Sequence, residues 1–271
     1  MVVAAVERTL TVIEALAGQP APLELSDLAA RTGLPASAAH RTLSTLVARG
    51  WVVQDADSQN YALSLRMPML AFRTLDMRFV PSVLQSALDG LADATREYCR
   101  LALVEAGSLT WVARAQGAAK GLRYDPDMGA EIVLHATANG KAWLSTLPEE
   151  EALALARPGL LAPGETGPNC IQSIDTLREH LREIRKRGFA TSIEEAEIGT
   201  AAVAVPVRGG PETEAPVVGT ISVAGPTLRI TADRIEPLAR ALSATAAEIS
   251  QLWPMHLRQR TQVPVGMAAA E

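Results

Sequence analysis

The feature that most constrains the fold of this 271-residue chain is a pair of short helices predicted over 27–32 and 36–49. Gly33 follows the first helix and Gly50 follows the second, in positions where glycine commonly ends helices. Ser26 is a good N-cap for the first helix, and Pro35 suits the first turn of the second. Two helices joined by a glycine-containing turn are the signature of a helix-turn-helix.

The segments on either side of this pair complete a small domain. Upstream, Val6, Leu10 and Ile13 recur at helical spacing before Gly18. Downstream, the apolar runs 51–53 and 61–63 flank a polar stretch, which predicts a β-hairpin, or wing. We therefore expect a winged helix-turn-helix over 1–64, followed by a linker helix over 65–79.

The charge distribution bears on whether this domain meets nucleic acid. The formal net charge of the chain is −5, which taken whole argues against a DNA partner. The N-terminal segment 1–78 is neutral, however, so the excess acid lies after it, and the stretch 28–54 contains no Asp or Glu. The net negative charge therefore lies in the remainder of the protein, while this stretch of the helix-turn-helix contains no acidic residue.

The helix over 36–49 separates into two faces. Ala39, Leu43, Leu46 and Val47 fall on one side, and the opposite side is polar and cationic. A helix fits the DNA major groove, where arginine contacts guanine and hydroxyl groups reach bases or phosphates. With the wing tip added, the residues expected to contact double-stranded operator DNA are Ser37, His40, Arg41, Ser44, Thr45, Arg49, Gln59 and Asn60.

Two points qualify this DNA-binding interpretation. A winged helix used only for protein contacts is an open alternative, with Arg41 as a solvated surface charge. Because the domain is neutral and phosphate neutralisation supplies much of DNA affinity, a monomer should bind weakly. We therefore expect a homo-oligomer that presents two recognition helices to a palindromic or repeated site.

From about residue 80 the pattern changes to an α+β domain over 80–254. Helices are predicted over 83–98, 137–147, 174–188 and 232–253, with one more between 147 and 174. Strands are predicted over 99–105, 109–115, 132–135, 190–193, 201–207 and 217–224. The remaining 255–271 is rich in Gln, Pro and Ala and is expected to be a disordered tail.

Several function classes lack their usual signatures. The sequence has no nucleophile elbow, phosphate-binding loop, dinucleotide fingerprint or zinc-protease motif, so we expect neither catalysis nor a cofactor or metal. His135 is the one plausible general base, and a structural role suits it better; Cys99 is expected to be a buried, inert thiol. No apolar run is long enough for a membrane span and no secretory signal is evident, which predicts a cytoplasmic protein. An enzyme with an appended helix-turn-helix is the competing class.

Several segments resemble the IclR family of bacterial transcription regulators, in the family's order and spacing, from about residue 4 to 253. In the N-terminal domain they are Val6-Glu7-Arg8-Thr9-Leu10, Leu25-Ser26-Asp27-Leu28-Ala29, Thr32-Gly33-Leu34 and His40-Arg41-Thr42-Leu43. In the C-terminal domain they are 135–142, 188–190 and 219–226. The resemblance implies a winged helix-turn-helix, a GAF-like α/β effector-binding domain, and dimers or dimers of dimers. Ala38 stands where many members carry a hydroxyl residue, so one DNA contact of the family is expected to be missing.

The resemblance also implies a small-molecule effector site on one side of the C-terminal sheet. Carried over position by position, its residues are Ala138, Asn139, Gly140, Ser192, Ala202, Ser222 and Ala224, and we add Met128 and Leu134 as apolar walls. A helix N-terminus near Gly140 suits a carboxylate. Because Ala202 and Ala224 replace polar residues found in some members, we expect an aromatic or branched carboxylate as the effector. Structural roles for Ser222, as a partner of a neighbouring strand, and for Asn139, as a helix cap, stay open.

Overall fold

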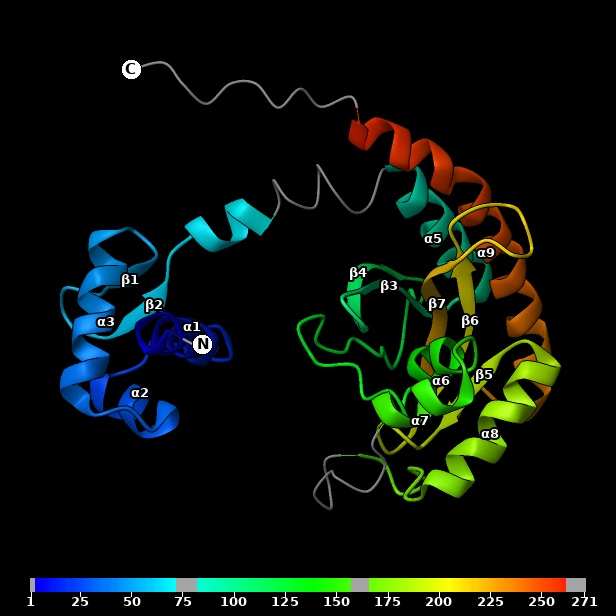
Figure 1. Ribbon diagram of the computed structural model, residues 1–271, viewed down its shortest axis with the longest axis horizontal. Helices are drawn as coiled ribbons and strands as arrows, with labels where there is room; N and C mark the ends of the chain where they lie inside the picture. The colour runs from blue at the N-terminus through cyan, green and yellow to red at the C-terminus, as the bar shows by residue number, and fades with distance from the viewer. Residues whose placement is uncertain (1–2, 72–81, 157–165, 262–271) are drawn as a thin grey trace. The chain divides into compact units, whose positions relative to one another are not determined.

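The computed structural model of the chain describes residues 3–71, 82–156 and 166–261. The chain divides into two compact units, Met1–Met77 and Arg78–Glu271, and each is described by itself (Figure 1). The boundary falls inside the linker helix expected over 65–79. Residues 66–71 of that segment are helical, and 72–79 lies outside the described residues.

The N-terminal unit contains the predicted helix-turn-helix and wing. Helices α1 (Ala4–Ala17), α2 (Leu25–Thr32) and α3 (Ala36–Ala48) pack together, and β1 (Val52–Gln54) pairs antiparallel with β2 (Tyr61–Leu63). Gly33 adopts a left-handed conformation with φ of 67°, which ends α2 as predicted. The buried side chains of this core are Val12, Leu16, Leu23, Leu28, Leu43, Leu46, Val52 and Tyr61.

Two local expectations for this unit are wrong. Ser26 does not cap α2, because the helix starts at Leu25 with Glu24 before it, and the Ser26 hydroxyl instead hydrogen-bonds the Glu24 carboxylate. Val47 is 37% exposed rather than buried, because it lies at the margin of the apolar arc of α3. Ala38 takes a place in the buried face, next to Ala39.

The C-terminal unit is built on a five-stranded antiparallel sheet. Its strands are β3 (Tyr98–Glu105), β4 (Ser108–Gln116), β5 (Ala190–Ile193), β6 (Thr200–Arg208) and β7 (Val217–Pro226), in the spatial order β4-β3-β7-β6-β5. The register places Arg100 opposite Ser222, and Ala202 opposite both Ala224 and Ser192. Residues directly opposite each other in a sheet project from the same face, so these side chains share one side.

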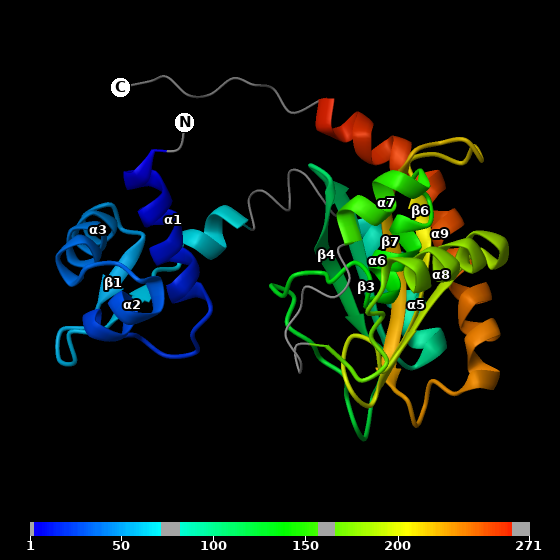
Figure 2. The same cartoon turned by 60° about the horizontal axis from the view of Figure 1, so that its bottom comes forward.

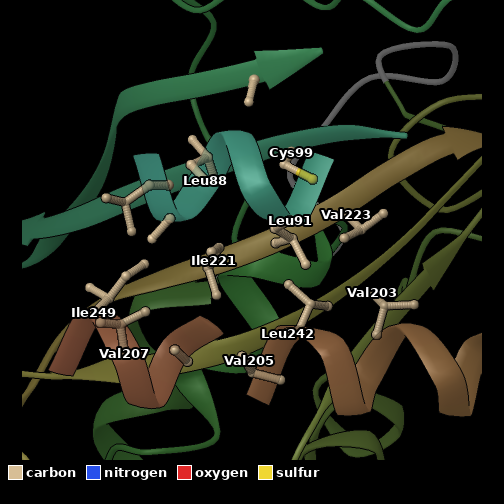
Figure 3. Packing of buried hydrophobic residues seen from close by; sticks show 14 of the residues in the cluster. Leu88, Leu91, Cys99, Val203, Val205, Val207, Ile221, Val223, Leu242 and Ile249 are labelled. Atoms are coloured by element: carbon tan, nitrogen blue, oxygen red, sulfur yellow. The ribbon is translucent and has the colours of Figure 1, made fainter. Parts of the chain in front are cut away.

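Helices lie on both faces of this sheet (Figures 1 and 2). Helices α5 (Ser82–Thr95) and α9 (Ala232–Thr261) cover one face and form the main apolar core with it. Figure 3 shows part of this core, with Leu88 and Leu91 of α5 and Leu242 of α9 against Val203, Val205 and Ile221 of the sheet. Helix α6 (Ala138–Leu144) lies on the other face, and α7 (Glu149–Ala156) and α8 (Ile174–Arg187) pack beside it.

Two predicted boundaries and one predicted strand in this unit are wrong. Tyr98 belongs to β3 instead of the preceding helix, because α5 ends at Thr95 and Arg96 then takes a positive φ of 60°. The predicted strand over 132–135 is a turn that leads into α6, with the amides of Ala136 and Thr137 bonded to the carbonyl of Val133. Helix α9 continues to Thr261, into the expected tail, and 262–271 lies outside the described residues.

Within 3–71, 82–156 and 166–261, no helix combines the length needed to cross a bilayer with sufficient apolar character.

Candidate functional site

The first candidate site is the exposed face of α3. All six α3 residues predicted to contact DNA are exposed, including Arg49, which caps the helix C-terminus. The Ser44 hydroxyl donates to the carbonyl of His40, and the Thr45 hydroxyl donates to that of Arg41. These bonds fix the two hydroxyl groups along the helix and leave their oxygens available as acceptors. Among the ion pairs of the described residues, none involves His40, Arg41 or Arg49.

The wing tip is more constrained than the sequence suggested. The Asp55 carboxylate accepts hydrogen bonds from the backbone and hydroxyl of Ser58, both at 2.8 Å, and these bonds lower the pKa of Asp55. Gln59, with a positive φ of 60°, donates to the Ala56 carbonyl and accepts from Gln54, while Asn60 is half-buried. The tip therefore keeps a negative charge at Asp55, which opposes close approach to phosphate.

The second candidate site is a cavity of about 30 Å³ on the α6 side of the sheet. Six of the nine predicted effector residues line it: Ala138, Asn139, Ser192, Ala202, Ser222 and Ala224. Its volume is enough for two or three waters, which is the size of a carboxylate group and far smaller than an aromatic acid. The lining residues that the sequence did not predict are Arg100, Tyr124, Thr137, Ala196, Thr200 and Ala201.

The other three predicted effector residues lie outside the lining. A Cβ on Gly140 would overlap the backbone of Leu134, so this glycine permits close packing of α6 on the preceding turn. Met128 and Leu134 pack at the edge of an apolar cluster that contains Trp111 and Trp143. Met128 also accepts a hydrogen bond from the Tyr98 hydroxyl, at 3.6 Å. These three residues shape the surroundings of the cavity rather than its wall.

The start of α6 is capped in part by the chain itself. The Thr137 side chain caps the helix by accepting from the amide of Gly140, at 3.1 Å. Asn139 is therefore not the cap; its side chain reaches the sheet and donates to the Thr220 hydroxyl, at 3.0 Å. Ser192 is also engaged, because its hydroxyl donates to the Ala136 carbonyl at 2.7 Å.

Two buried polar atoms near the cavity are left unpaired. Among the buried side-chain nitrogen and oxygen atoms of the described residues, Arg100 Nε and Ser222 Oγ have no hydrogen-bond partner. The open alternative, in which the Ser222 hydroxyl bonds a neighbouring strand, is not what the structure shows. The signal for Arg100 was present in the sequence: one charged residue in the apolar run Cys99-Arg100-Leu101-Ala102-Leu103.

The residues considered for catalysis are buried in settings that suppress reactivity. His135 is buried, its Nδ1 is 2.8 Å from the Ala156 carbonyl oxygen, and burial lowers its pKa. Burial raises the pKa of the Cys99 thiol to about 12, so it stays protonated. Lys141 lies two positions after the cavity residue Asn139. Its buried ammonium forms an ion pair with Glu195, and burial lowers the pKa of Lys141.

Comparison with known proteins gives the same two-part division. Residues 5–56 match the IclR helix-turn-helix domain, and residues 72–251 match the family described as bacterial transcriptional regulator IclR C-terminal. The transcriptional repressor IclR of Escherichia coli K12 is 28% identical over 90% of this chain and 87% of its own length. The regulator KdgR of the same strain is 25% identical over 94% of each chain.

Solved structures agree on the fold. An IclR transcriptional regulator from Alicyclobacillus acidocaldarius superposes with a TM-score of 0.77 at 25% identity, over 92% of this chain and 98% of that one. An IclR homologue from Microbacterium hydrocarbonoxydans, complexed with 4-hydroxybenzoate, gives 0.73 at 22% identity, over 94% and 99%. The winged helix-turn-helix, the α/β effector domain and both family matches lead to one conclusion: the chain belongs to the IclR family of DNA-binding bacterial transcriptional regulators.

Proposed function

We propose that this regulator recognises an operator through α3, and that an organic carboxylate bound in the C-terminal cavity controls its affinity for that operator. The observation that carries the proposal is the exposed face of α3, which is polar and cationic and lies in a stretch without acidic residues. The DNA contacts proposed are those of Ser37, Arg41, Ser44 and Thr45 at the centre, with the remaining predicted residues at the edges. A regulator that acts on chromosomal DNA works in the cytoplasm.

The character of the cavity supports a carboxylate effector. Its lining contains the cation of Arg100 and the polar groups of Asn139, Ser192 and Ser222, and none of the described residues that line it is Asp or Glu. A short acid fits with small adjustments of the wall. An aromatic or branched acid requires Tyr124 or the apolar cluster around Trp111 to move, because the cavity volume is only about 30 Å³. The strand order β4-β3-β7-β6-β5, with the cavity between sheet and α6, is consistent with the GAF-like topology that we propose.

A homo-oligomer is part of the proposal because the DNA-binding unit is electrically neutral. Helix α1 offers a surface for a second copy. Val3 at its N-cap and Val6 and Leu10 within it are 59%, 56% and 54% exposed, and we call these three the α1 stripe. Burying the stripe in a dimer would bring two α3 helices to one operator, which compensates for the weak electrostatic attraction of each.

Coupling between the two sites is proposed to run through the segment that joins the units. Effector binding would change how the two α3 helices of a dimer are presented, and hence their fit to the operator half-sites. The chain would work by binding alone, without catalysis, a view supported by the buried, hydrogen-bonded His135 and the protonated Cys99.

A gel shift on the intergenic DNA upstream of the gene tests the proposed function. We expect the wild-type protein to shift this fragment, with the shift altered by one of a panel of acids: glyoxylate, pyruvate, benzoate and 4-hydroxybenzoate. The last compound is chosen because the Microbacterium homologue was solved with it. A protein that shifts neither this fragment nor a longer one covering the neighbouring genes would contradict the DNA-binding role.

A further inference from the structure

Arg100 stands apart from the other buried charges of the described residues. It is 9% exposed, and no carboxylate forms an ion pair with it there. By contrast, Glu97 accepts from both Arg229 and Arg234, and Lys141 is paired with Glu195. A buried charge is costly unless it is paired and hydrogen-bonded. Because the chain pairs its other buried charges, the Arg100 guanidinium is the buried charge that is suited to bind a partner from outside the chain.

Arg100 is contacted by two aromatic rings and by the side chain of Tyr124, to which it is hydrogen-bonded, while its Nε has no partner among the described residues. Its Cζ lies 3.7 Å from the ring centroid of Trp111 and 5.7 Å from that of Tyr98. Ring faces orient a guanidinium, but they do not accept its in-plane N–H bonds as an oxygen would. Burial lowers the pKa of Arg100, and the nearby hydroxyls of Tyr124 and Tyr98 offset this only in part.

Ser222 supplies a second unpaired group at the same place. It lies on β7 directly opposite Arg100 on β3, it is 1% exposed, and its Oγ lacks a partner within the described chain. Both residues line the cavity of about 30 Å³. The neighbouring lining positions Ala202 and Ala224 carry small side chains, which leaves room in the cavity beside the two groups.

We propose that Arg100 and Ser222 form the anchor that binds the carboxylate of the effector, an inference that rests on the proposed function. A carboxylate is an acceptor-only group with two oxygens, which matches a guanidinium edge and a hydroxyl donor. Among the described residues that line the cavity, Arg100 is the single cation, so a monoanion balances the charge, whereas a phosphate dianion leaves an excess negative charge. The cavity volume also matches a carboxylate group. The anchor therefore selects organic monocarboxylates and rejects their neutral amides.

The test is a binding measurement with full-length protein and matched probes. Acetate, pyruvate, benzoate and 4-hydroxybenzoate are titrated by calorimetry and thermal shift at constant ionic strength, beside acetamide, benzamide and inorganic phosphate. The variants are Arg100→Gln, Arg100→Lys and Ser222→Ala, with Arg240→Gln on the exposed surface of α9 as the control. Arg100→Gln removes an unpaired buried charge, so its melting temperature should equal or exceed that of the wild type, and Ser222→Ala tests the site without changing any charge.

We expect at least one monocarboxylate to bind the wild type and the control equally, with its amide at least about 30-fold weaker. Arg100→Gln should weaken that acid at least about 30-fold, Arg100→Lys should fall between, and Ser222→Ala should cost about 5- to 10-fold. The anchor is refuted if no acid in the panel binds, if acid and amide bind alike, or if Arg100→Gln binds the acid as the wild type does. Phosphate binding tighter than every monocarboxylate would overturn the assignment of a monoanion.

A gel shift on the upstream DNA, run with the same preparations, separates this inference from the proposed function. A protein that binds DNA while no acid depends on Arg100 refutes the anchor and keeps the DNA-binding role. A protein that binds an acid through Arg100 but shifts no DNA keeps the anchor and refutes that role.

Discussion

Replacing Arg41 with alanine removes a cation from the centre of the exposed α3 face and leaves the core of the domain untouched. The side chain is exposed and takes part in none of the ion pairs of the described residues, so folding stability should change by no more than about 0.5 kcal/mol. The consequences should therefore appear in DNA binding.

The size of the loss in DNA affinity follows from the number of Arg41 side chains that contact one operator. An arginine that reads a base contributes about 1–3 kcal/mol, and a dimer presents two, so the dimer–operator complex should lose about 2–6 kcal/mol. The lower figure corresponds to about a 30-fold weaker affinity. Fluorescence anisotropy on the upstream fragment and on a scrambled fragment of equal length measures it, with Arg240→Ala on α9 as the control.

The two fragments and the salt dependence decide how Arg41 acts. A base contact predicts a loss on the operator, a smaller loss on the scrambled fragment, and relaxed preference at one position of each half-site. A phosphate contact predicts an equal loss on both fragments and a salt slope reduced by about 1 for each contact removed. Unchanged affinity on both fragments would refute the assignment of α3 as the DNA-reading helix.

Three further predictions follow from buried or unpartnered groups. Gly140→Ala should lower the urea-unfolding free energy of the C-terminal unit by about 1–3 kcal/mol, because the new Cβ meets the backbone of Leu134. Gly90→Ala places its Cβ in open space and should raise that free energy by up to about 1 kcal/mol. An equal effect of the two substitutions would contradict the packing of Gly140. Burial raises the pKa of the Cys99 thiol from 9.0 to about 12, so the stability that the protonated thiol contributes is present below pH 9 and is lost as pH rises toward 12. In a variant that lacks the other cysteine, the Cys99 thiol should resist thiol reagents until the protein unfolds. Rapid labelling of the native protein would refute this. Leu10→Glu should dissociate the dimer in sedimentation experiments and weaken DNA binding, and an unchanged dimer would exclude the α1 stripe as the interface.

Local patterns were sufficient to predict the helix-turn-helix, because its signals act over short distances. Gly33 takes the left-handed conformation that ends α2, and the apolar spacing of Leu43 and Leu46 fixes which side of α3 is buried. The prediction that Val47 lies on the buried side of α3 was wrong, because a residue at the margin of an apolar arc is buried only if a neighbouring element of the fold covers that margin. The predicted strand over 132–135 failed for a related reason: an apolar run indicates burial, and Ile132 is buried against Trp143 without any partner strand.

The effector cavity was predicted in part, since six of its lining residues followed from the family's segments. Arg100 could not be assigned from its own neighbourhood, because its meaning depends on β7 bringing Ser222 opposite it. The sequence shows only a charge within an apolar strand. Thr137, similarly, was identified as a helix start, but its capping of the Gly140 amide depends on the geometry of α6.

The measurement that tests the account most directly is the affinity of the full-length protein for its upstream DNA, with and without a monocarboxylate that it binds. We predict that the acid changes this affinity at least about fivefold for the wild type, in line with a coupling free energy of about 1 kcal/mol or more. The Arg100→Gln variant should bind the DNA alone as the wild type does and should not respond to the acid. A wild-type protein that binds the acid with no change in its affinity for DNA would contradict effector control, the central claim.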